Sequence, residues 1–129
     1  MTIQICDETV PGKRSNATVI HLDAQLLTLR ELIRTRVRQE VEIYNQNLPE
    51  TFQGLVQPEQ SEQILNGFRL KVRRPLDWEA QFRQACSSFE RNGFLILVDD
   101  EQVTDLDAKI QLHEDTQVNF VKLVPLVGG

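Results

Sequence analysis

The strongest constraint on the fold is an amphipathic helix predicted over residues 28–44. Thr28 and Glu31 have the spacing of a capping box, in which each side chain accepts a hydrogen bond from the other residue's backbone N–H. The apolar residues that follow recur every three or four positions: Leu29, Leu32, Ile33, Val37, Val41 and Tyr44. The opposite face is charged, with Arg30, Arg34, Arg38 and Glu42. A helix with a single apolar stripe needs a second layer to cover it, so we expect it to cross a sheet.

The segments on both sides of this helix are typical of strands. Ile3 to Cys6 alternates apolar and polar residues, and Ala17 to Leu22 is a second β-rich run that is close enough to form a hairpin with the first. Phe94 to Val98 is a continuous apolar run, which predicts a strand buried on both faces. Val103 resumes extended structure, and Val118 to Val124 is the last predicted strand. The pattern indicates an α+β domain with a mixed sheet of four or five strands.

The segment 45–93 between helix and third strand is an elaboration with its own helix. Pro49, Gly54 and Pro58 mark a polar excursion, and Phe68 to Val72 is a short predicted strand. Asp77 is a good N-cap for a second apolar stripe, formed by Trp78, Phe82, Ala85, Cys86 and Phe89 and ended by Asn92-Gly93. Cys86 lies on this stripe, so we expect a buried, inert thiol. The segment either covers the sheet or adds a binding surface.

Length and charge exclude several classes of protein. The chain has 129 residues, which is the size of a single domain, 1–129, and a net charge of −5, which disfavours binding to nucleic acid. The basic cluster Arg69, Lys71, Arg73 and Arg74 is more typical of a solvated strand edge. No apolar run is long enough to cross a membrane, and the N-terminus does not resemble a signal peptide. We therefore expect a cytoplasmic protein, and two cysteines fit a reducing compartment.

The sequence contains none of the usual catalytic patterns. It has no glycine-rich phosphate loop, no paired His or Cys motif and no nucleophile elbow. His21 and His113 are far apart, and the acidic residues from Asp99 to Asp107 lack the spacing of a calcium loop. We expect no metal, no cofactor bound by this chain and no enzymatic activity.

The end of the sequence has a distinct chemistry. Gly128 and Gly129 follow an apolar strand and Pro125. Glycine has no Cβ, so such a tail fits a narrow channel and adopts backbone angles that other residues avoid. A carboxylate on Gly129 could accept AMP from ATP held by a partner enzyme, and the acyl-adenylate would then react with a thiol, a sulfide or an amine. Residues 125–129 are expected to form a flexible tail.

The order of these elements resembles the β-grasp fold of ubiquitin and of the bacterial sulfur carriers of molybdopterin and thiamine biosynthesis. Residues 28–32, Thr-Leu-Arg-Glu-Leu, are similar to the start of the family helix. Asp115 to Phe120 is similar to the entry into the last strand, and residues 125–129, Pro-Leu-Val-Gly-Gly, to the family tail. The resemblance covers residues 1–44 and 94–129, whereas the segment 45–93 departs from the small sulfur carriers.

The resemblance implies activation of Gly129 by an adenylating enzyme of the ubiquitin-activating class. Conjugation to target proteins would add a conjugating enzyme and a deconjugating protease as partners, whereas a sulfur carrier would end in a thiocarboxylate. Family partners grip the tail, here Pro125, Leu126 and Val127, and the sheet beside it. Strand alternation puts Val118 and Phe120 toward the helix and leaves Val121 and Leu123 as docking residues, unless 45–92 buries them. The extra segment favours a modifier, and a non-covalent interaction module is the alternative from another class.

Overall fold

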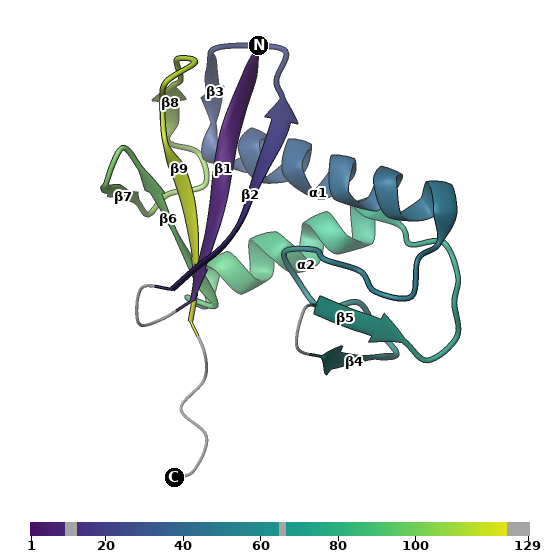
Figure 1. Cartoon of the computed structure of the whole chain (residues 1–129). Helices are drawn as coiled ribbons and strands as arrows, with labels where there is room; N and C mark the ends of the chain where they lie inside the picture. The colour runs from purple at the N-terminus through teal and green to yellow at the C-terminus, as the bar shows by residue number, and fades with distance from the viewer. Residues whose placement is uncertain (10–12, 65–66, 124–129) are drawn as a thin grey trace, which may run out of the picture.

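The computed structural model describes residues 1–9, 13–64 and 67–123, and the side chains of 13–16 are left out of the description. The described strands and helices follow one another as β1 Thr2–Thr9, β2 Lys13–His21, β3 Leu26–Thr28, α1 Leu29–Asn47, β4 Ser61–Ile64, β5 Gly67–Leu70, α2 Trp78–Glu90, β6 Phe94–Val98, β7 Glu101–Val103, β8 Lys109–Gln111 and β9 Val118–Lys122 (Figure 1). The predicted α+β class is confirmed. Pro125, Leu126, Val127, Gly128 and Gly129 lie outside the described residues, so the predicted tail is not described.

Five of the described strands form one mixed sheet in the order β2-β1-β9-β6-β7. The first two strands form the predicted hairpin, and β6 pairs antiparallel with both β7 and β9. The two central strands, β1 and β9, run parallel, with Ile5 opposite Val118 and Thr9 opposite Lys122. The first and last strands therefore lie side by side in the middle of the sheet. This arrangement is compatible with the fold that the sequence resembles.

Helix α1 begins as predicted and crosses one side of the sheet. The Thr28 hydroxyl accepts from the N–H of Glu31 at 3.1 Å, and the Glu31 carboxylate accepts from the N–H of Thr28 at 3.3 Å. The helix runs three residues beyond the predicted end at Tyr44, to Asn47, and Leu48 closes it in the left-handed region with φ 44°. The whole predicted apolar stripe is buried. The capping box and the stripe thus fixed both the start of the helix and its orientation.

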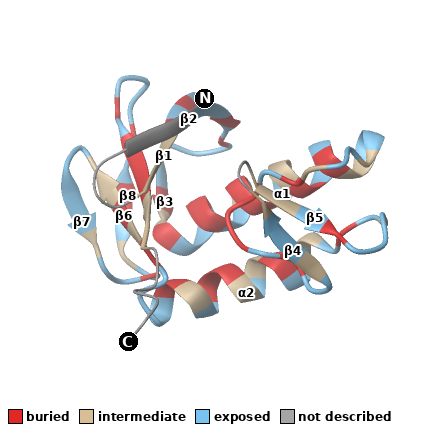
Figure 2. Cartoon of the chain, turned by 60° about the horizontal axis from the view of Figure 1, so that its bottom comes forward, coloured by how far each residue is buried: buried red, intermediate tan, exposed pale blue. Residues whose placement is uncertain are grey.

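The segment 45–93 packs on the same side of the sheet as α1. Helix α2 lies beside α1, and Figure 2 shows buried residues recurring along both helices. The Phe89 ring lies 5.7 Å from that of Phe94, which in turn lies 6.1 Å from Phe120, so α2 adds to the core beneath the sheet. The N-cap Asp77 accepts from the N–H of Glu79 at 3.0 Å, as the sequence predicts.

The loop before α2 is anchored by aromatic contacts. Phe52 is buried with its ring 5.3 Å from Tyr44, and it exchanges two backbone hydrogen bonds with Phe68 at the start of β5. Gly67 has φ 146°, and a Cβ there would lie 2.5 Å from the carbonyl oxygen of Phe52. Only glycine permits this close approach, which ties the β4–β5 hairpin to α1.

Two short strand pairs were not predicted. Strand β3 pairs with β8, so that Leu27 lies opposite Ile110, and β4 pairs with β5. The predicted strand over 68–72 is β5, which starts at Gly67 and ends at Leu70. Strands of three or four residues contain too few positions for alternation to mark them, and their partners are set by the surrounding fold.

Candidate functional site

The sheet has a covered face and an outer face, and the outer face is the candidate functional site. Val118 and Phe120 point toward the helices and are 1% and 0% exposed, as predicted. Val121 alternates with them and lies on the outer face, half-buried. In Figure 1, α1 emerges from behind β1 and β2, and both helices extend to the right of the sheet.

The outer face is of mixed character. Its apolar side chains are Cys6, Val19, Leu95, Leu97 and Val121, and the strand registers place the polar residues Gln4, Glu8, Gln102 and Asn119 beside them. Val19 is 55% exposed, whereas Cys6, Leu95, Leu97 and Val121 are half-buried. Within the described part of 45–92, α2 packs against the opposite face. The alternative to docking was that residues 45–92 bury Val121 and Leu123. Both side chains are half-buried.

This arrangement corrects the prediction that Phe94–Val98 is buried on both faces. Phe94 and Ile96 are buried on the helix side, but Leu95 and Leu97 on the outer side are only half-buried. The physical reason is that both helices lie on one side of the sheet. Alternate residues of this apolar strand therefore place two partly exposed leucines on a face that no helix of the described residues covers.

The last strand emerges from the middle of the sheet. Lys122, its final residue, lies opposite Thr9 of β1 and Phe94 of β6. The N–H of the next residue, Leu123, donates to the carbonyl of Gly93 at 3.2 Å and continues the pairing with β6. Leu123 is half-buried and follows Val121 by two positions, so the two predicted docking residues lie at the end of the strand from which the chain continues.

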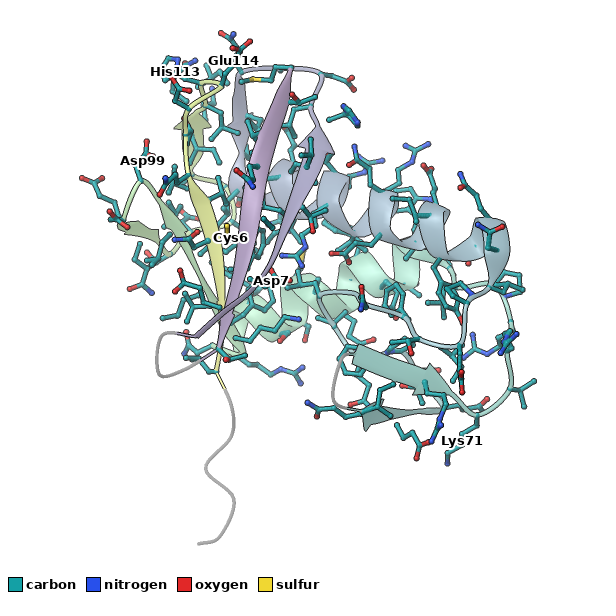
Figure 3. All side chains as sticks on the ribbon, in the orientation of Figure 1. Cys6, Asp7, Lys71, Asp99, His113 and Glu114 are labelled. Atoms are coloured by element: carbon teal, nitrogen blue, oxygen red, sulfur yellow. The ribbon has the colours of Figure 1, made fainter. Side chains whose placement is uncertain are left out.

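A buried charge cluster lies on the covered side of this same end. The Arg36 guanidinium is 4% exposed and donates to both oxygens of Asp7, at 2.7 and 2.8 Å, and to Glu40 at 2.5 Å (Figure 3 labels Asp7). Its Cζ lies 4.3 Å from the centre of the Phe120 ring. Burial lowers the pKa of Arg36, but the two carboxylates outweigh burial, so the net pKa is raised and the guanidinium stays charged.

The same cluster connects the last strand to the inserted segment. Glu40 also accepts from the N–H of Leu55 at 3.0 Å, and the Lys122 ammonium donates to the carbonyl of Gly54 at 3.4 Å. Burial lowers the pKa of Lys122 from its ordinary value of 10.5. Sequence reasoning missed this cluster, although a signal was present: Arg36 follows Ile33 by three positions, and Glu40 follows Val37 by three, so both lie next to the apolar stripe.

The other candidate residues behave as solvated or structural groups. Cys86 is buried, and burial raises the pKa of its thiol, which agrees with an inert cysteine. His21 and His113 are exposed, and Figure 3 shows His113 at the edge of the molecule beside Glu114. Within residues 1–9, 13–64 and 67–123, no group of three or more His, Cys, Asp or Glu side chains is arranged to hold a metal ion.

Known proteins do not supply a relative. Comparisons with protein-family models, with curated proteins and with solved structures found no match. None of the helices in the described part of the chain is both long and apolar enough to cross a membrane.

Proposed function

We propose that this chain is a ubiquitin-like β-grasp protein that acts as a substrate of an adenylating enzyme of the ubiquitin-activating class. The observation that carries the proposal is the strand order β2-β1-β9-β6-β7 with β1 and β9 parallel at its centre, and with α1 crossing one face directly after the first hairpin. This strand order is compatible with a β-grasp sheet, to which the pairs β3–β8 and β4–β5 would be additions. A Gly-Gly sequence follows the central strand β9.

The proposed chemistry takes place on the Gly129 carboxylate. One of its oxygens attacks the α-phosphorus of ATP bound to the partner enzyme, an acyl–phosphate bond forms, and pyrophosphate leaves. A nucleophile then attacks the activated carbonyl carbon, and AMP leaves with the electron pair of the broken C–O bond. In a modifier, an enzyme thiol displaces AMP to form a thioester, and the amine of a target lysine then displaces that thiol. In a carrier, sulfide displaces AMP and leaves a thiocarboxylate. The partner enzyme supplies ATP, and the chain itself supplies the acyl group.

The outer face supports the docking part of this proposal. Val121 and Leu123 lie at the tail end of β9, next to the half-buried Leu95 and Leu97 of β6. Apolar side chains on a face that no described helix covers can bury area against a partner without rearrangement of the core. A partner enzyme seated there would lie beside the start of the tail, with Pro125, Leu126 and Val127 continuing toward its nucleotide site.

Segment 45–93 favours a protein modifier over a sulfur carrier. It adds α2 and the β4–β5 hairpin on the helix side and leaves the outer face to the activating enzyme. A modifier attached to a target is read by further proteins, for which additional surface is useful. A carrier that delivers one sulfur atom has less use for it.

The experiment is intact-mass spectrometry of the chain after incubation with ATP and an extract of its native host. We expect an ATP-dependent ladder of adducts, each heavier than the free chain by the mass of a target protein. Deletion of Gly128 and Gly129 should abolish this ladder. An affinity tag that follows Gly129 should block the reaction until a protease removes it. Circular dichroism should be the same for the deleted and the intact chains.

Three other results have distinct meanings. Replacement of one oxygen atom by sulfur at the C-terminus would identify the sulfur carrier. Adducts that persist without the two glycines would contradict the tail chemistry. Function that tolerates both the deletion and the tag would identify a non-covalent interaction module that uses its surface alone.

A further inference from the structure

A basic and aromatic surface runs along the paired helices, away from the outer face of the sheet. We call it the Arg–Trp strip, and it consists of Arg30, Arg34 and Arg38 of α1 with Trp78, Phe82 and Arg83 of α2. The three arginines of α1 are spaced by four residues and so form one ridge, about 12 Å long. All three are exposed, whereas Trp78 and Phe82 are half-buried beside them.

The indole of Trp78 orders two of these arginines. The Cζ of Arg34 lies 5.3 Å from the centre of the Trp78 ring and that of Arg38 lies 5.2 Å from it, both within the range of a cation–π contact. Stacking uses the flat side of a guanidinium and leaves its N–H edge free for an acceptor. The two arginines are therefore held in place before any ligand arrives.

Two cations of the strip, Arg34 and Arg83, have no ion-pair partner among the described residues. Arg30 pairs with Asp107 at 3.2 Å and Arg38 with Glu42 at 2.9 Å, and all four side chains are at least 44% exposed. In contrast, no carboxylate of the described residues lies within ion-pair distance of Arg34 or Arg83. Glu31 and Glu79 lie three and four positions before Arg34 and Arg83 on the same helices but form no ion pair with them, so both guanidinium groups are open to an acceptor from a partner.

A shallow hollow continues the strip toward the end of α2. It has a volume of about 370 Å³, and its lining includes Arg30, Phe82, Arg83, Glu90 and Arg91. Arg30 is paired with Asp107, so Arg83 and Arg91 against Glu90 leave the hollow slightly positive, and the Phe82 ring gives it an apolar wall. Such a site can take a carboxylate and an adjacent apolar side chain together.

We propose that the Arg–Trp strip binds an acidic, partly apolar peptide segment of a partner protein. Carboxylates of the segment pair with Arg34 and Arg83, and its apolar side chains pack on Trp78 and Phe82. A protein segment is favoured over a nucleic acid because the chain carries a net charge of −5 and because the strip joins its cations to the apolar side chains of Trp78 and Phe82. This binding involves neither Gly128 nor Gly129, so it stands or falls independently of the tail chemistry.

Trp78 makes the test direct because it is the only tryptophan of the chain. The probe is a synthetic peptide of three Asp-Glu-Leu repeats, titrated into the full chain while tryptophan emission is recorded. We expect a saturable change in emission that weakens as salt is added, since exposed charges are screened. The double variant Arg34→Glu, Arg83→Glu should lose at least about tenfold in affinity, because both pairs become repulsive.

A matched control changes the net charge equally at another place. Lys71 and Arg73 are exposed and lie after β5, where Figure 3 labels Lys71 far from the sheet, so Lys71→Glu, Arg73→Glu should bind the peptide as the parent chain does. If the first variant fails to fold, Arg83→Gln alone should still weaken binding severalfold, because no described carboxylate pairs with Arg83. Equal loss in both double variants, no response of Trp78, or tighter binding of an oligothymidine than of the peptide would overturn the proposal.

Discussion

The two faces of the five-stranded sheet differ in what they contribute. On the covered face, Ile3, Ile96 and Phe120 are at most 2% exposed and pack against α1 and α2. On the outer face, Val19 is 55% exposed and Val121 is half-buried. Both helices, including the one in the extra segment, contribute to the covered face. The comparison teaches that residues 45–93 lie where their helix deepens the core, while the outer face stays partly exposed.

If this division holds, substitutions on the covered side should unfold the protein, and those on open surfaces should leave it folded. Burial of apolar area contributes about 25 cal/mol per Å² to folding, and a half-exposed side chain has less area to lose. Three substitutions, taken from the largest expected effect to the smallest, test where the division lies.

The largest effect is expected for Arg36→Met. The change removes the cation that lies between Asp7 and Glu40, whose side chains are only 17% and 15% exposed. The two poorly solvated carboxylates then lose the guanidinium that donates to both of them, although methionine fills most of the space. Loss of one partner from a buried ion pair costs about 3–5 kcal/mol of unfolding free energy. Urea unfolding followed by circular dichroism measures it.

Arg38→Met is the matched control on the same helix. Its guanidinium pairs with Glu42 at 2.9 Å, but the two side chains are 54% and 55% exposed. An exposed pair of this kind contributes about 1 kcal/mol or less. Similar losses in the two variants would mean that the charges beneath the sheet are as well solvated as those at the surface, and the covered face would no longer be distinct.

The next effect compares one substitution on the two sides of one strand. Val118→Ala removes two methyl groups that are 1% exposed, and we expect a loss of about 2 kcal/mol from burial and the cavity left behind. Val121→Ala, three positions along β9, removes the same groups from the outer face, and we expect less than about 1 kcal/mol. Thermal unfolding of both variants measures the difference, and the reverse order would place the core on the outer face.

The parts of the fold that the sequence predicted are those with local signals. The capping box of Thr28 and Glu31 and the spacing of the apolar residues are properties of one helix, and both were confirmed. The alternation in β9 likewise predicted which side Val118 would face. Each of these signals depends on residues close together in the sequence, so the predicted structure does not require knowledge of the tertiary packing.

The features that the sequence did not predict correctly depend on which element packs against them. An apolar run such as Phe94–Val98 shows that a strand is buried, but periodicity does not say whether a helix covers one face or two. Arg36 was missed because a cation next to an apolar stripe is read as solvent-facing unless its partner is known, and Asp7 lies on another element. For the candidate site, the sequence located Val121 on the open side, whereas Gly128 and Gly129 lie outside the described residues and remain a prediction.

The smallest effect concerns Lys122, which ends the central strand on the covered side. Burial lowers its pKa below 10.5, so between the lowered pKa and 10.5 the unfolded chain binds more protons than the folded one. Stability contributed by this group therefore rises with pH in that window and is lowest at neutral pH, where the folded protein holds a charged, poorly solvated ammonium. Lys122→Met removes this dependence, so the difference in unfolding free energy between the parent chain and the variant should shift in favour of the parent as pH rises from about 8 to about 10. Lys109→Met, which removes an exposed lysine of β8, is the control for the loss of one positive charge. A constant difference for Lys122 would show that its ammonium is fully hydrated and that the last strand leaves the covered face before residue 122.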